Sequence, residues 1–167
     1  MGMWFVPFWR QRLVTVTLLA LSACALPPQK DSPSSMVWNG RLAMTINSTP
    51  SESVQAGFEL SGDAQHGQLL LLTPIGTTAA RAQWSPERVV VQRGQSQQTF
   101  IDTDSMMVAL TGAPLPLDAL FDWLRGASTA VPGWSVELGS PQSHRLIARR
   151  TAPEPTLTLR VVLNPSP

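Results

Sequence analysis

Apolar and polar residues alternate along most of the chain between residues 38 and 163. The clearest case is the segment 38–47, in which Trp38, Leu42 and Met44 fall on one face. A period of two is typical of a strand that buries one face and exposes the other. The same pattern recurs and predicts about nine strands, over residues 38–47, 54–61, 68–73, 78–84, 89–91, 99–101, 134–138, 144–149 and 156–163.

The period changes between the sixth and seventh expected strands, where two short helices are predicted. Residues 105–111 form the first helix, which Asp102 or Asp104 can cap at its start and Gly112 can end. Residues 117–125 form the second helix. Its apolar residues recur at the spacing of one helical face, at Leu117, Leu120, Phe121 and Leu124.

Nearly every expected connection is short, which favours antiparallel neighbours. The predicted fold is mainly β with inserted helices: an open, curled antiparallel β-sheet, or unclosed half-barrel, with the helices as a lid. The pattern leaves two interpretations of the apolar face under that lid, a filled core or a cavity for an apolar ligand. The lining expected for a cavity combines the sheet face with the helix stripe, at Met44, Phe58, Leu60, Met106, Met107, Leu110, Leu120, Phe121 and Leu124. Methionine suits a site that repacks around varied chains.

Composition and charge exclude several classes of protein. The 167 residues are 43% hydrophobic, too apolar for a disordered chain, and 12 Lys+Arg against 11 Asp+Glu give no basic field for nucleic acid. One cysteine and two histidines cannot supply a Cys and His zinc cluster or an intramolecular disulfide. A nucleophile and base pair would need His66 or His144, both expected at the surface, and helix capping explains Asp102 and Asp104. We therefore expect no enzyme, no cofactor and no bound metal.

The first 24 residues have the pattern of a secretory signal that ends at a cysteine. Arg10 and Arg12 precede an apolar run over residues 13–20, which is too short to span a bilayer. The tetrapeptide Leu-Ser-Ala-Cys that ends at Cys24 resembles the lipobox of bacterial lipoproteins. The resemblance implies cleavage after residue 23 and acylation of the Cys24 thiol. Two or more acyl chains hold a protein stably on a membrane.

Three segments are therefore expected along the chain. Residues 1–23 are the signal peptide, residues 24–35, rich in Pro and Ser, are a tether, and residues 36–167 are the folded domain. Ala25 follows the cysteine, where lipoproteins of the inner membrane often carry Asp. By that resemblance, the expected location is the outer membrane, with the domain anchored at Cys24 and facing the periplasm.

Four short segments occur in the order in which a known family carries them. They are Trp-Asn-Gly-Arg-Leu-Ala at 38–43, Leu-Leu-Leu-Thr-Pro-Ile-Gly at 70–76, Leu-Thr-Gly-Ala-Pro-Leu-Pro-Leu at 110–117 and Trp-Leu-Arg-Gly at 123–126. Together with the lipobox, they resemble the LolB family of outer-membrane lipoproteins. The resemblance implies an apolar cavity that accepts the acyl chains of cargo lipoproteins from the periplasmic carrier LolA. The cargo then passes to outer-membrane lipid without a nucleotide, and we expect the protein to be a monomer.

A turn separates the third and fourth expected strands, at Thr73–Thr77. Pro74 fixes its own φ and Gly76 allows a left-handed turn, so Ile75 can be held at the tip of a loop. The resemblance implies that Pro74, Ile75 and Gly76 match a family loop whose exposed apolar residue helps the membrane step. The alternative is that Ile75 folds back onto the core.

Two features depart from the family pattern. The proline-rich stretch 25–35 stands where the family has a helix, and the chain is trimmed beyond Thr151. A second function stays open, in which a structural or assembly lipoprotein uses its β-domain to dock an envelope complex without a ligand. A third, hydrolysis, lacks a visible nucleophile and base pair.

Overall fold

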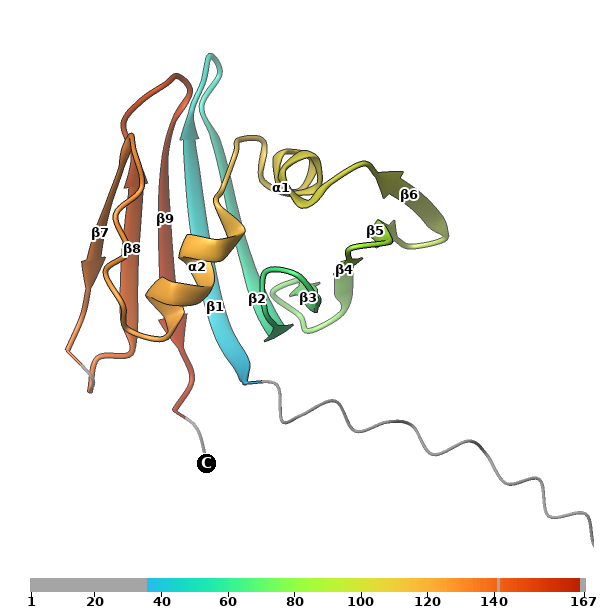
Figure 1. The fold of residues 1–167 in the computed structure, drawn as a ribbon, viewed down its shortest axis with the longest axis horizontal. Coiled ribbons are helices and arrows are strands. Elements are labelled where there is room, and N and C mark those ends of the chain that lie inside the picture. The colour runs from blue at the N-terminus through green and yellow to red at the C-terminus, as the bar shows by residue number, and fades with distance from the viewer. Residues whose placement is uncertain (1–35, 141, 166–167) are drawn as a thin grey trace, which may run out of the picture. The chain divides into compact units, whose positions relative to one another are not determined.

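The computed structural model describes residues 36–140 and 142–165. These residues form nine strands and two helices (Figure 1). The strands are β1 (Val37–Asn47), β2 (Glu52–Gly62), β3 (Gly67–Leu72), β4 (Thr78–Ser85), β5 (Arg88–Arg93), β6 (Ser96–Phe100), β7 (Trp134–Leu138), β8 (Arg145–Arg150) and β9 (Thr156–Leu163). The helices are α1 (Thr103–Thr111) and α2 (Leu117–Leu124). The expected signal peptide, the tether and Cys24 lie outside the described residues.

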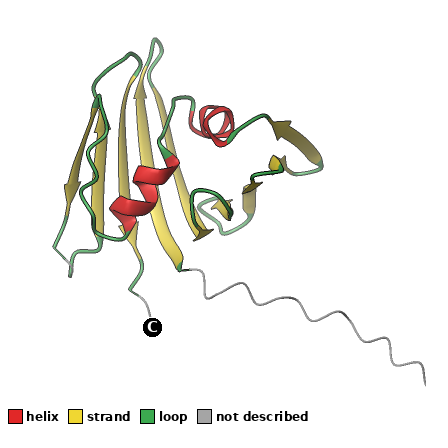
Figure 2. Cartoon of the chain, viewed as in Figure 1, coloured by secondary structure: helices red, strands yellow, loops and turns green. Residues whose placement is uncertain are grey.

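All nine strands belong to one antiparallel sheet, in the order β6-β5-β4-β3-β2-β1-β9-β8-β7. β1 pairs with β2 on one side and with β9 on the other. β6 and β7 are the two edges and do not pair with each other, so the sheet is unclosed. Both helices lie in the chain between these edge strands (Figure 2). The predicted mainly β fold, with an unclosed antiparallel sheet and inserted helices, is confirmed.

β1 shows how the period of two sets the faces of the sheet. Trp38 and Met44 are buried, whereas Asn39 and Arg41 on the opposite face are exposed. Met44 pairs with Leu159 of β9, which is also buried. Because side chains alternate along every strand, this register aligns the apolar faces of neighbouring strands.

Local capping sets the ends of α1. The Asp102 carboxylate accepts a hydrogen bond from the Ser105 backbone N–H at 2.7 Å, so Asp102 rather than Asp104 is the cap. Gly112 follows the helix with a φ of 76°, and its N–H donates to the Val108 carbonyl at 2.8 Å. The predicted start and stop signals of this helix are confirmed.

The observed bounds match the predicted ones for β7 and β9, whereas those of the other strands differ by one or more residues, and β6 and β8 show why. β6 spans Ser96–Phe100 rather than residues 99–101, because its exposed polar residues pair with β5 without an apolar pattern to mark them. β8 begins at Arg145, and His144 lies in the preceding turn with a φ of 46°. The His144 carbonyl accepts a hydrogen bond from the Leu163 N–H at 2.8 Å, which fixes this turn against β9.

The buried apolar side chains gather between the sheet and the helices. Figure 1 shows α2 in front of β1 and β9, and α1 on the side of β5 and β6. The largest fully buried side chains come from both helices and from the sheet: Trp123, Phe121, Leu60, Met106, Met107, Leu157 and Val91. In the part of the chain that the structure describes, no helix combines the length and the apolarity needed to cross a membrane.

Candidate functional site

An apolar cavity of about 70 Å³ lies between the sheet and both helices. Its lining comes from five strands, the two helices and the link between them: Leu42, Met44, Val54, Ala56, Phe58, Leu60, Leu69, Leu71, Trp84, Met107, Leu110, Thr111, Leu115, Leu117, Leu120, Leu124, Leu159 and Val161. Two of these side chains carry polar atoms, and both have partners. The Trp84 indole donates to the Asp63 carbonyl at 2.9 Å, and the Thr111 hydroxyl donates to the Met107 carbonyl at 2.7 Å. The walls therefore suit a hydrocarbon chain.

Most of the predicted lining residues border this cavity. They are Met44, Phe58, Leu60, Met107, Leu110, Leu120 and Leu124. Met106 and Phe121, which are 0% and 1% exposed, do not border it and belong to the packed core. The Phe121 ring centroid lies 5.5 Å from that of Trp38 and 6.3 Å from that of Trp84. Helical spacing places residues on a buried face but does not separate those at a cavity from those packed next to it.

Sequence reasoning missed the contributions of β3, β4 and β9 to the cavity. Leu69 and Leu71 face it, but the run of leucines over 69–72 hid which of them turn inward. Leu159 and Val161 share one face of β9, a signal that the sequence does carry. What the sequence does not display is the pairing of β9 with β1, which brings these two residues to the cavity.

The cavity is small for an acyl chain. A dry engineered cavity of about 150 Å³ holds one benzene molecule, whereas this one measures about 70 Å³. A long chain therefore enters only when part of the wall moves. The interactions that hold each helix indicate which part that is.

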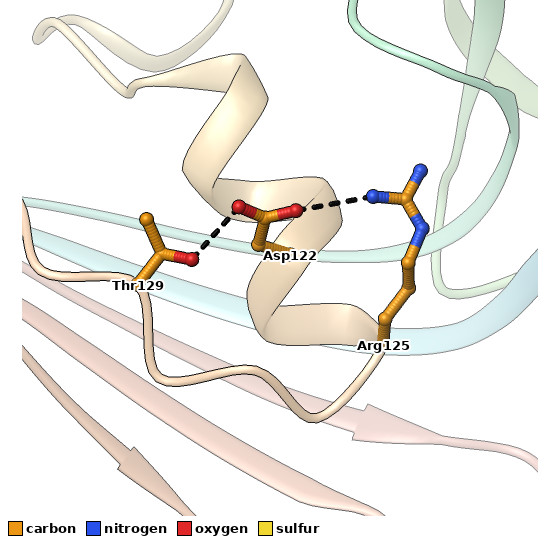
Figure 3. A network of polar contacts seen from close by, with 3 residues as sticks. All are labelled: Asp122, Arg125 and Thr129. Atoms are coloured by element: carbon orange, nitrogen blue, oxygen red, sulfur yellow. Dashed lines mark hydrogen bonds and ion pairs between the residues drawn. The ribbon is translucent and has the colours of Figure 1, made fainter.

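α2 is held at its C-terminal end by polar contacts as well as by burial (Figure 3). The Asp122 carboxylate accepts hydrogen bonds from the Arg125 guanidinium at 3.2 Å and from the Thr129 hydroxyl at 2.7 Å. The Trp123 indole N–H donates to the Thr129 carbonyl at 2.9 Å. The Arg125 guanidinium also lies 5.8 Å from the centroid of the Trp38 ring. These contacts tie the end of α2 to the sheet and to the link that follows the helix.

α1 rests on fewer buried side chains. Met106 and Met107 are its buried residues, whereas Val108 is 42% exposed. A hydrogen bond from the Arg93 guanidinium to the Ala109 carbonyl, at 2.8 Å, joins the helix to β5. Of the two helices, α1 therefore loses less buried surface when it moves.

The loop between β3 and β4 holds Ile75 away from the core. The Thr73 N–H donates to the Thr77 carbonyl and the Gly76 N–H to the Thr73 carbonyl, each at 2.8 Å, and the two threonine hydroxyls lie 2.7 Å apart. Gly76 has a φ of 86°, as expected for a left-handed turn. Ile75 is 86% exposed, so its side chain does not pack into the domain. Its role at a membrane stays a prediction.

The carboxylates with shifted pKa values lie away from the cavity lining and have structural causes. The His66 backbone N–H donates to the Asp63 carboxylate at 2.8 Å and is the main cause of its lowered pKa. Hydrogen bonds from Ser105 lower the pKa of Asp102.

His66 and His144 are both exposed between strands. Across residues 36–140 and 142–165, no group of three or more His, Cys, Asp and Glu is placed to hold a metal ion.

The chain is similar to outer-membrane lipoproteins. The family described as Outer membrane lipoprotein LolB matches residues 35–151, which include both helices and the loop that carries Ile75. The Outer-membrane lipoprotein LolB of Bordetella petrii is 33% identical over 128 residues, 71% of this chain and 63% of the relative. The protein of the same name from Bordetella pertussis is 32% identical over 90 residues, 52% of this chain and 45% of the relative. The chain thus spans less than two thirds of the length of these curated relatives. Because the family match covers more than half of the chain, the chain belongs to the LolB family.

Proposed function

We propose that this protein is a receptor that accepts lipoproteins from a LolA-type periplasmic carrier and inserts them into the outer membrane. Acyl chains on Cys24 anchor it there, and the domain faces the periplasm. The observation that carries this function is the cavity, whose walls are apolar and whose polar atoms already have partners, in a chain of the LolB family. The protein acts as a monomeric transport factor and not as an enzyme.

Cargo binding rests on the burial of acyl chains. Moving α1 off the sheet exposes Met106 and Met107, which costs about 1.5–3 kcal/mol for each side chain. Each methylene that enters the cavity contributes about 0.8 kcal/mol, so about four to eight methylenes offset the opening of α1. The cargo leaves because the bilayer buries the same chains at least as well as the cavity does.

The loop of Pro74, Ile75 and Gly76 makes the membrane contact in this function. Burying an isoleucine side chain contributes roughly 1.5–3 kcal/mol. That is too little to anchor a protein, but it biases an already tethered loop toward the bilayer. Shallow insertion of Ile75 brings the domain against the membrane, so the cargo chains cross little water.

Depletion of the protein in its native cells tests the receptor function. Cargo lipoproteins should accumulate on the periplasmic carrier, as measured by their co-purification with it. Restoring the wild-type chain should clear them, whereas Cys24→Ala should leave the protein soluble in the periplasm because no acyl anchor forms. A carrier that stays unloaded on depletion would contradict the receptor function and favour a structural or assembly lipoprotein.

Ile75→Glu tests the membrane step, and the chain offers a matched control. Ile101, in the link between β6 and α1, is 92% exposed, so Ile101→Glu adds the same charge at another exposed isoleucine. Ile75→Glu should keep the melting temperature and the acceptance of cargo but impair its release into liposomes. Ile101→Glu should release cargo as the wild type does. Normal release by Ile75→Glu would show that the loop is not the membrane contact.

A further inference from the structure

The face of the sheet opposite the cavity carries an open groove of about 640 Å³. Three arginines line it, Arg41 on β1, Arg145 at the start of β8 and Arg160 on β9, and no carboxylate does. All three are exposed. Within the described residues, the ion pairs join other groups, and none involves these three guanidinium groups. The groove is therefore a local site of positive charge on a chain whose overall charge is close to zero.

The register of the sheet brings together arginines that are far apart in the sequence. Val162 pairs with Arg41 on one side and with Arg145 on the other, so these two arginines are two strand spacings apart, about 10 Å. Arg160 is the next residue of β9 on the same face. Glu59 of β2 also faces this side but does not line the groove. The three charges therefore converge without an acidic neighbour in the lining.

A glycine opens the floor of the groove. Gly57 pairs with Arg41 on one side and with Leu72 on the other. A Cβ atom at this position would lie 3.3 Å from the Leu72 Cβ. Any larger side chain would therefore fill the space between Leu72 and Arg41. The absence of a side chain leaves room for a group to reach the base of the arginines.

One end of the groove is formed by the loop that presents Ile75. Thr73, Pro74 and Gly76 line the groove, and the Ile75 side chain between them is 86% exposed. When Ile75 enters the acyl region of a bilayer, the adjoining groove lies at the level of the headgroups. The group that an arginine meets at that level is a lipid phosphate.

We propose that this groove binds the phosphate groups of anionic phospholipids in the membrane that Ile75 enters. A guanidinium group matches the geometry of phosphate oxygens and stays charged at physiological pH. Three of them side by side repel one another until an anion joins them. The choice of a lipid over a soluble phosphate rests on the proposed membrane contact of Ile75. Together, the groove and the loop fix the orientation of the domain on the bilayer, which an acyl anchor alone does not do.

The test measures binding of the full chain to vesicles, with Cys24→Ala so that no acyl anchor masks the effect. The vesicles contain either phosphatidylcholine alone or phosphatidylcholine and phosphatidylglycerol in equal amounts. Each arginine near an anionic surface contributes about fivefold to binding, so Arg41→Gln/Arg160→Gln should bind the mixed vesicles about 25-fold more weakly. The matched control is Arg81→Gln/Arg88→Gln on β4 and β5, which removes the same charge outside the groove. It should change binding by less than about twofold, and both double variants should keep the wild-type melting temperature because these side chains are exposed.

Three results would overturn the proposal. Equal weakening by the two double variants would show general charge attraction rather than a site. Equal binding of the wild type to both kinds of vesicle would show that anionic headgroups are not recognised. Equal binding of the wild type and Arg41→Gln/Arg160→Gln to mixed vesicles, together with binding of inorganic phosphate by the wild type alone, would assign the groove to a free phosphate instead of a lipid.

The same measurements separate the groove from the proposed function. If Ile75→Glu delivers cargo normally while the groove variant still loses binding to mixed vesicles, membrane insertion of Ile75 is contradicted and lipid binding by the groove is supported. If Ile75→Glu impairs delivery while the groove variant binds as the wild type does, the receptor function stands and the groove fails.

Discussion

The two helices of the insertion border the same cavity, but different interactions hold them in place. α2 buries six of its eight residues and is tied at its end by the contacts of Asp122 with Arg125 and Thr129 (Figure 3). α1 buries Met106 and Met107 and depends on the caps at its two ends. α2 therefore contributes six buried side chains to the core, whereas α1 contributes two and depends more on local contacts.

This difference assigns two roles to neighbouring helices: α2 stabilises the domain, and α1 is the helix that can open the cavity. Segments with few buried apolar contacts open at a lower free energy than the core does. A cavity of about 70 Å³ needs such a segment in order to admit a chain, and α1 has this property. We therefore expect α2 to keep the rest of the wall in place while α1 moves. Substitutions on the two helices should therefore separate unfolding from ligand access.

Phe121→Ala should have the largest effect, because Phe121 is 1% exposed and packs against Trp38 and Trp84. Removing a buried phenylalanine costs about 3–5 kcal/mol of unfolding free energy. Urea unfolding followed by circular dichroism measures the loss. The control is Val108→Ala on the exposed side of α1, which should stay within about 0.5 kcal/mol. A loss below about 1 kcal/mol of unfolding free energy for Phe121→Ala would contradict the difference between the two helices, because α2 would then not belong to the core.

Met107→Ala should cost less, about 2 kcal/mol, at the low end for a buried methionine. Met107 is 2% exposed but borders the cavity, so the site already has free space and the helix can shift into it. Binding of a fluorescent acyl probe should be kept, because the substitution widens an apolar wall. Loss of probe binding in a variant that is still folded would show that the Met107 side chain contacts the bound probe, and that α1 does more than control access to the cavity.

The strands and the second helix could be predicted because their patterns are local. Alternation along β1 identifies its buried face from the sequence, and the spacing of Leu117, Leu120 and Leu124 identifies the face of α2 that reaches the cavity. β6 has no such pattern, because an exposed edge strand of polar residues buries no face. Its bounds were therefore the least accurate part of the prediction.

The sites could be predicted only in part, because they depend on pairing between distant strands. The contact of β1 with β9 places Leu159 and Val161 at the cavity, and the same contact places Arg41 beside Arg160 on the outer face. Residues separated by more than a hundred positions have no shared local pattern. Ile75 could be placed at a loop tip because the turn chemistry of Pro74 and Gly76 is local.

Gly112→Ala should have a moderate effect on the end of α1. Gly112 has a φ of 76°, and holding an ordinary residue in the left-handed region costs about 1–2 kcal/mol. Gly126, which follows α2, has a φ of 87°, so Gly126→Ala is a matched control for the backbone strain. The new Cβ would lie 2.8 Å from the Ile46 Cδ1 at position 112, whereas it would meet nothing within 4 Å at position 126. Gly112→Ala should therefore lower the melting temperature more than Gly126→Ala does. Equal decreases would show that the end of α1 shifts without cost to relieve the contact with Ile46.

Asp102 should have the smallest effect, one that depends on pH. The hydroxyl of Ser105 and then its backbone N–H hold the pKa of the Asp102 carboxyl below its ordinary value of 3.8. Because the pKa is lower in the folded state, the unfolded state binds the proton more readily. The stabilisation is therefore present in full above the ordinary pKa and is lost as the pH falls through the folded value. Asp102→Ala should lower the melting temperature near neutral pH and have less effect in acid.

Asp102→Asn separates the charge from the cap, because an asparagine side chain also accepts the Ser105 N–H but does not titrate in this range. Asp63 and Glu87 also have lowered pKa values and contribute an acid dependence of their own. The difference between the melting temperatures of wild type and Asp102→Asn at each pH cancels that background. The difference should shrink as the pH falls below 3.8. A difference that stays constant with pH would show that the carboxylate charge does not stabilise α1.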